Sequence, residues 1–130
     1  MVLFFLNVAI SSSVKPNFDN SDFRGAMVAE NVLSGTLFTN TDFSDSLFGD
    51  QDLTTVDFTG STFFKTSFFH TDLTGTDFTN MDIERAKFAW SLLKNVNLKN
   101  TDLTGVDLSG KIYVGQELPG ATIDDSDLSN

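Results

Sequence analysis

Side chains suited to catalysis are scarce in this chain of 130 residues. Cysteine is absent, which excludes disulfides, thiolate catalysis and cysteine-based metal sites. His70 is the only histidine, and no nucleophile or orienting partner lies at a spacing that would make it a catalytic base. Neither a phosphate-binding loop nor a metal-ligand cluster is evident. We therefore expect no enzymatic activity and no cofactor.

Carboxylates are the abundant chemical group. The chain has 18 acidic and 8 basic residues, a net charge of −10, which argues against direct nucleic-acid binding because phosphates require a basic surface. Asp outnumbers Glu by 15 to 3. Since Asp favours turns and Glu favours helices, this ratio argues against a helical protein. A calcium site is poorly supported, because no loop gathers six oxygen ligands.

The elements that position these groups repeat every five residues. Residues 16–130 divide without insertion into 23 units, such as TDLTG at 71–75 and TDFTN at 76–80. The third residue of every unit is apolar, and the second is Asp or Asn in twelve units. Neither a helical period of 3.6 nor a strand period of 2 produces this pattern.

This pattern resembles the pentapeptide-repeat family, whose motif is A(D/N)LXX with Leu or Phe at the centre. The resemblance covers residues 16–130, about nine-tenths of the chain. It implies an all-β fold, a right-handed quadrilateral β-helix of about six coils with four five-residue units in each. It also implies that the first and third residues of each unit point inward and the other three outward.

The order of the central residues supports four units per coil on its own. Leu recurs every twenty residues, at 33, 53, 73 and 93, and Phe does so at 38, 58 and 78 and at 43 and 63. A superperiod of 20 places like residues above one another in successive coils. We expect stacked aromatic and leucine columns to fill the core, since a solenoid buries its core against neighbouring repeats.

Ten of the fifteen Asp occupy the second position of a unit, where a short acceptor can bind the amides of a turn. Most of the acidity is thus expected as a consequence of the fold. The alternative is an acidic, DNA-mimicking rod like the quinolone-resistance members of the family, which bind DNA gyrase. Its acidic faces would carry Asp52, Asp57, Asp72, Asp77, Asp82 and Asp102.

An aromatic–basic patch is predicted on the middle coils. In the repeat register its members are Phe64, Lys65, Phe69, His70, Arg85, Lys87 and Trp90. Two interpretations remain open. In the first, the rings pack along the coil edges and add stability. Alternatively, the patch binds a protein, because exposed apolar clusters usually mark a partner surface and Trp and Arg are typical anchors.

Residues 1–15 are expected to form an N-terminal apolar segment or cap, with the remnant of a targeting sequence as the alternative. Their apolar run of ten residues is too short for a membrane span. Since solenoid ends need covering, we expect homodimerisation through one end or capping by residues 1–15. A cytoplasmic location is favoured, with an exported or organelle-targeted form as the alternative. The function expected is a structural scaffold or protein-interaction module with a protein partner, and the alternative is the gyrase-directed DNA mimic.

Overall fold

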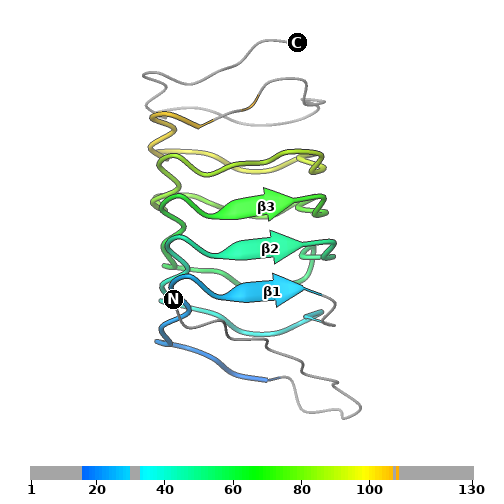
Figure 1. Ribbon diagram of the computed structural model, residues 1–130, viewed down its shortest axis with the longest axis vertical. Helices are drawn as coiled ribbons and strands as arrows, with labels where there is room; N and C mark the ends of the chain where they lie inside the picture. The colour runs from blue at the N-terminus through cyan, green and yellow to red at the C-terminus, as the bar shows by residue number, and fades with distance from the viewer. Residues whose placement is uncertain (1–15, 30–32, 107, 109–130) are drawn as a thin grey trace.

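A computed structural model describes residues 16–29, 33–106 and 108. It has three short strands, β1 (Met27–Ala29), β2 (Leu47–Gly49) and β3 (Ser67–Phe69). They form one parallel sheet in the order β1-β2-β3, and Figure 1 shows them stacked one above the next along the long axis. The expected cap at residues 1–15 and the last units of the repeat lie outside the described residues.

Every strand pair and bridge joins residues twenty apart. Met27 pairs with Leu47 and Leu47 with Ser67, and on another face Asp22 pairs with Asp42 and Asp82 with Asp102. One turn of the chain therefore takes four five-residue units, which confirms the superperiod predicted from the sequence. The described part of the molecule is a β-helix.

The third residue of each unit forms the core. All described central residues from Val28 to Leu108 are buried, and only Phe18 and Phe23 are partly exposed. The predicted aromatic columns are present: the rings of Phe43 and Phe63 stack with centroids 5.4 Å apart and 3° between their planes. Phe68 stacks on Phe48 at 5.4 Å and on Phe88 at 5.2 Å. Such pairs contribute about 0.5–1.5 kcal/mol each beyond the area that they bury.

Hydroxyl groups at the first position link adjacent coils. The Oγ1 of Thr66 donates to the carbonyl oxygen of Phe43 at 2.7 Å, and that of Thr101 donates to the carbonyl of Phe78 at 3.1 Å. Ser91 makes the same bond to the carbonyl of Phe68. Small hydroxyl residues fit this inward position, and several of them satisfy buried carbonyl groups. The hydroxyls of Thr36, Ser46 and Thr76 are buried there without a hydrogen-bond partner.

Most units end in a β-turn that directs the chain onto the next side of the coil. In the turn that begins at Leu73, the amide of Thr76 donates to the carbonyl of Leu73 at 2.9 Å and Gly75 has φ of +75°. This combination is a type II turn, which needs a positive φ at its third residue. Gly or Asn therefore often stands at the fifth position of a unit, whereas Trp90, with φ of +62°, is an unusual occupant.

Candidate functional site

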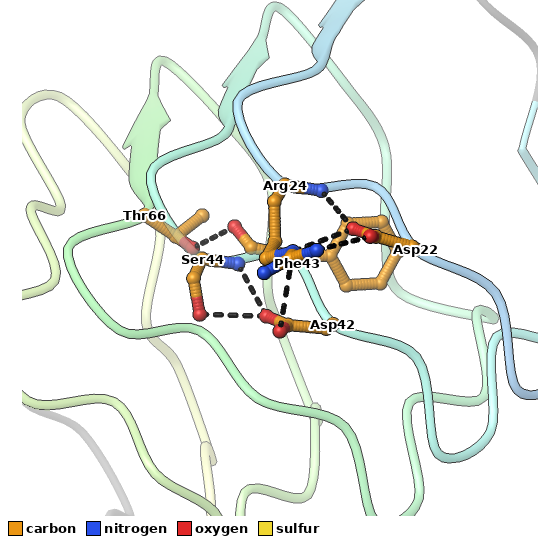
Figure 2. Close-up of polar contacts among 6 residues, drawn as sticks. All are labelled: Asp22, Arg24, Asp42, Phe43, Ser44 and Thr66. Carbon is orange, nitrogen blue, oxygen red and sulfur yellow. Dashed lines mark hydrogen bonds and ion pairs between the residues drawn. The ribbon is translucent and has the colours of Figure 1, made fainter.

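Aspartates at the second position hold the turn that follows them. All eight described ones accept a hydrogen bond from the amide two residues later, at 2.9–3.1 Å. Figure 2 shows this for Asp22, which also pairs with the Arg24 guanidinium at 2.6 Å, and for Asp42, which accepts from both the amide and the hydroxyl of Ser44. The predicted capping role is confirmed.

These bonds favour the charged carboxylate. The Arg24 side chain, which donates to Asp22, lowers the pKa of that carboxyl from 3.8 to about 2. The hydroxyls of Thr54 and Thr104 lower the pKa of Asp52 and Asp102 in the same way. These carboxylates already accept hydrogen bonds within their own turns. Their negative charge is therefore explained by the fold before any role in binding is considered.

The acidic faces carry two pairs of aspartates in register. Asp52 pairs with Asp72 and Asp82 with Asp102 in adjacent coils, whereas Asp57 pairs with Leu37 and Asp77 with Asn97. The side chains of Asp52, Asp57, Asp77, Asp82 and Asp102 are exposed, and Asp72 is half-buried. Among the described residues no group of three His, Cys, Asp or Glu side chains could hold a metal ion.

Exposed apolar side chains gather at a single corner of the described residues. Phe69 is 45% exposed, Leu92 54% and Trp90 76%, and these are the only large apolar side chains exposed in the described part of the chain. Phe69 ends β3, and Trp90 and Leu92 lie at the corresponding corner of the adjacent coil. We call this region the Trp90 corner and include in it Asp50, Gln51, Phe69, His70, Asp72, Trp90 and Leu92.

The Trp90 corner is hollowed. An open depression of about 390 Å³ is lined by six of its residues, namely Asp50, Gln51, His70, Asp72, Trp90 and Leu92, together with Thr71. His70 Nδ1 lies 2.5 Å from Oδ1 of Asp50, one coil away, and both side chains are largely exposed. The Phe69 ring lies 6.3 Å from the His70 ring. Trp90 makes no ring contact with an aromatic side chain of the described residues.

The other residues of the predicted aromatic–basic patch lie away from this depression. Phe64 is half-buried, and Lys65 Nζ lies 4.8 Å from the centre of its ring. Arg85 Nε lies 3.3 Å from Glu84 Oε1, and the Arg85 side chain reaches toward Gly105 of the next coil. Lys87 is exposed and pairs through its backbone with Ser67. The structure thus brings His70 and Trp90 to one depression, beside Phe69, and leaves the four others outside its lining.

Four residues of the Trp90 corner were not expected from the patch pattern, although Asp72 was expected on the acidic faces. Leu92 occupies the second position of its unit, where Asp or Asn is common, and this departure was a signal in the sequence. Asp50 lies twenty residues before His70 in the same column, so the register could have found it. Gln51 is only 4% exposed, and its Nε2 donates to the carbonyl oxygen of Gly49 at 2.9 Å.

The described residues contain no helix of the length and apolarity that a membrane span requires. A search of curated proteins returns no match. Among solved structures, a pentapeptide repeat protein from the cyanobacterium Cyanothece 51142, named Rfr23, aligns with a TM-score of 0.57 at 17% identity. That alignment covers 85% of this chain and 90% of that protein. At this identity the similarity concerns the fold alone.

Two further solved structures align less well. A pentapeptide repeat protein from the Arabidopsis thaliana thylakoid lumen has a TM-score of 0.45 and 23% identity over 82% of this chain, which spans 63% of that protein's length. QnrB1, a plasmid-mediated fluoroquinolone resistance protein, has a TM-score of 0.42 and 16% identity, over 89% of this chain and 84% of its own.

A family model described as pentapeptide repeats matches residues 41–80 and 71–110 with eight copies. These two ranges together span more than half of the chain, and within them lie most of the pairs twenty residues apart and most of the buried central residues described above. The chain belongs to the pentapeptide repeat family.

Proposed function

We propose that this protein is a non-catalytic interaction module that binds a protein partner through the Trp90 corner. The observation that carries the proposal is the gathering of all three exposed large apolar side chains of the described residues around one depression. Elsewhere the described surface is rich in carboxylates that serve the turns. Apolar patches of this kind mark partner surfaces, and Trp is one of the side chains enriched among binding anchors.

The test is affinity capture of partners from the native organism with the full chain as bait. Trp90→Asn removes the indole and keeps a residue that tolerates the positive φ. We expect it to lower partner recovery at least about tenfold, as loss of a binding anchor does. Asp45→Asn is the control, because it introduces the same residue at the fifth position of another unit, where φ is +59°. Unchanged recovery with Trp90→Asn would refute the proposal.

The wider patch that includes Phe64, Lys65, Arg85 and Lys87 is a broader form of the same proposal. Arg85→Asn separates the two, because Arg85 also has a positive φ, of +57°, and lies outside the depression. If binding uses the whole aromatic–basic patch, recovery falls with Arg85→Asn as it does with Trp90→Asn. If binding is confined to the Trp90 corner, Arg85→Asn leaves recovery unchanged.

A second candidate function is DNA mimicry directed at DNA gyrase. The observation that favours it is the in-register pairing of Asp52 with Asp72 and of Asp82 with Asp102 on a chain of net charge −10. The protein would then inhibit gyrase supercoiling at low salt and lose potency as salt rises, because exposed charges are screened. Asp82→Asn with Asp102→Asn would weaken inhibition. A chain that fails to inhibit gyrase at low salt is no such mimic.

For the whole repeat region, residues 16–130, we propose a right-handed coil of about six turns, following the family resemblance. The twenty-residue register of the described residues supports four units per turn throughout. Covering of a solenoid end by residues 1–15 or by a second copy of the chain belongs to the same proposal. A solution mass measurement on the full chain and on a chain without residues 1–15 distinguishes a homodimer from a capped monomer.

A further inference from the structure

We infer that the depression at the Trp90 corner is a guanidinium site that receives an arginine side chain of the protein partner. This inference rests on the interaction role proposed above and names the chemistry of the contact. The volume of about 390 Å³ lies near the lower end of the range of about 300–1,000 Å³ that small-molecule pockets occupy, and suits one extended side chain. The charge, the aromatic surface and an unused acceptor of the depression all point to the same group.

The charge of the depression is negative. Asp50 and Asp72 line it, and no Lys or Arg is among the lining residues. His70 is the basic partner of Asp50, whereas no ion pair among the described residues involves Asp72. Asp72 uses Oδ1 to accept the Thr74 amide at 2.9 Å, which leaves Oδ2 to bind a cation. Asp22 differs, because Arg24 of the same unit already neutralises it.

The apolar surface of the depression fits the rest of an arginine side chain. Trp90 is 76% exposed, so the faces of its indole are open to a ligand. Guanidinium groups stack on indole faces, where the planar cation meets the negative face of the ring. Leu92, 54% exposed, offers an apolar wall for the methylene stem that carries the guanidinium.

Gln51, which lines the depression, carries a hydrogen-bond acceptor without a partner. The side chain is buried, and its Nε2 donates to the carbonyl oxygens of Gly49 at 2.9 Å and Asp50 at 3.4 Å. Its Oε1 is buried without a hydrogen-bond partner. A guanidinium has five N–H donors in a planar fork, whereas an ammonium has three on a single atom. Arginine is therefore better suited than lysine to donate a hydrogen bond to Asp72 and to direct a further N–H toward Gln51.

The test uses the intrinsic fluorescence of Trp90, the only tryptophan of the sequence. The full chain is titrated at constant ionic strength with N-acetyl-arginine amide, N-acetyl-lysine amide and N-acetyl-citrulline amide, the last a neutral analogue with nearly the same shape. We expect a saturable change with the arginine compound in the millimolar range, as a single side chain can provide. The citrulline compound should bind at least about tenfold more weakly, and the lysine compound several-fold more weakly.

Asp72→Asn should weaken arginine binding about fivefold or more, because it removes the charge and keeps the acceptor for the Thr74 amide. Asp77→Asn is the matched control: Asp77 accepts the Thr79 amide at the same 2.9 Å one unit later, outside the depression. An equal response to citrulline, an equal response to lysine, or no effect of Asp72→Asn would each overturn the guanidinium assignment.

The partner capture described above separates this inference from the proposed function. Capture that depends on Trp90 without any arginine response would leave the interaction role intact and refute the arginine site. Saturable arginine binding together with capture that survives Trp90→Asn would keep the guanidinium site and refute the role of the corner in partner binding.

Discussion

At the scale of single residues, the aspartate of each unit is a structural side chain that also determines the charge of the protein. Asn97 accepts the Lys99 amide at 3.1 Å, at the same position in the unit where aspartates accept theirs, so the fold requires the oxygen and not the charge. The carboxylates nevertheless gain from the hydrogen bonds that they accept within their units, which lower the pKa of Asp22, Asp52 and Asp102. The acidity of the chain is therefore tied to its stability at low pH.

Asp22 provides the sharpest test of that link. Its pKa falls from 3.8 to about 2 on folding, mainly through the Arg24 side chain. A lowered pKa means that the carboxylate stabilises the folded protein above about pH 4, and that this stabilisation disappears as the pH falls through about 2. We expect the urea midpoint to decrease as the pH is lowered from about 4 to about 2. In Asp22→Asn the decrease should be smaller. Equal pH dependence of the two proteins would contradict the assignment.

Also at this scale, the exposure of a residue depends on its neighbours as well as on its position in the unit. Leu37, Leu47 and Leu92 all occupy the second position, but the first two are half-buried and only Leu92 is exposed. The sequence pattern predicts that all three point outward. It cannot say which one remains uncovered, because that depends on the side chains of the adjacent coils.

At the scale of the elements, the turn at the end of each unit sets the conformational demand on the fifth residue. Gly49, the last residue of β2, is the fourth residue of its unit: it has no positive φ, and a Cβ built there meets nothing within 4 Å. Gly75 also has open space around a built Cβ, but its φ is +75°. Neither glycine would bring an added Cβ into a clash, but only Gly75 has a positive φ. Substitution at the two positions therefore isolates the effect of backbone strain.

We expect Gly75→Ala to lower the free energy of unfolding by about 1–2 kcal/mol, because an L residue is strained at that φ. Gly49→Ala should leave it unchanged or raise it by about 0.4–1 kcal/mol, since alanine restricts the unfolded chain without strain in the folded one. Urea denaturation of both variants measures the difference. Equal destabilisation by the two substitutions would show that the turn geometry is not what selects glycine at position 75.

At the scale of the whole molecule, the twenty-residue register turns a local preference for Asp into ladders of like charge. Two carboxylates about 4.8 Å apart repel by about 0.9 kcal/mol at the dielectric constant of water. Asp82 with Asp102 is such a pair, and Asp77 with Asn97 is the same arrangement with one charge removed. The repulsion in the Asp82–Asp102 pair can therefore be compared with that in the Asp77–Asn97 pair, which carries only one charge.

The ladders predict that salt stabilises this protein. Raising NaCl from about 10 to about 100 mM shortens the Debye length from about 30 to about 10 Å, so the thermal midpoint should rise, by an amount equivalent to about 1 kcal/mol or less. Asp102→Asn should reduce the rise and Asn97→Asp should increase it, because both variants keep the turn acceptor. The same salt response in all three proteins would refute repulsion along the ladders.

The sequence by itself determined the repeat, the inward residues and the register, because a period of five with a superperiod of 20 allows only one way to stack Leu33, Phe38 and Phe43 on their counterparts. It also determined that His70 and Trp90 share a column. Only the tertiary structure decided that Gln51 retains an unpaired Oε1, that Asp50 contacts His70 and that Leu92 is exposed. A repeat specifies the direction of each side chain, whereas contacts and exposure depend on the size and rotamer of neighbours in other coils, which no single unit contains.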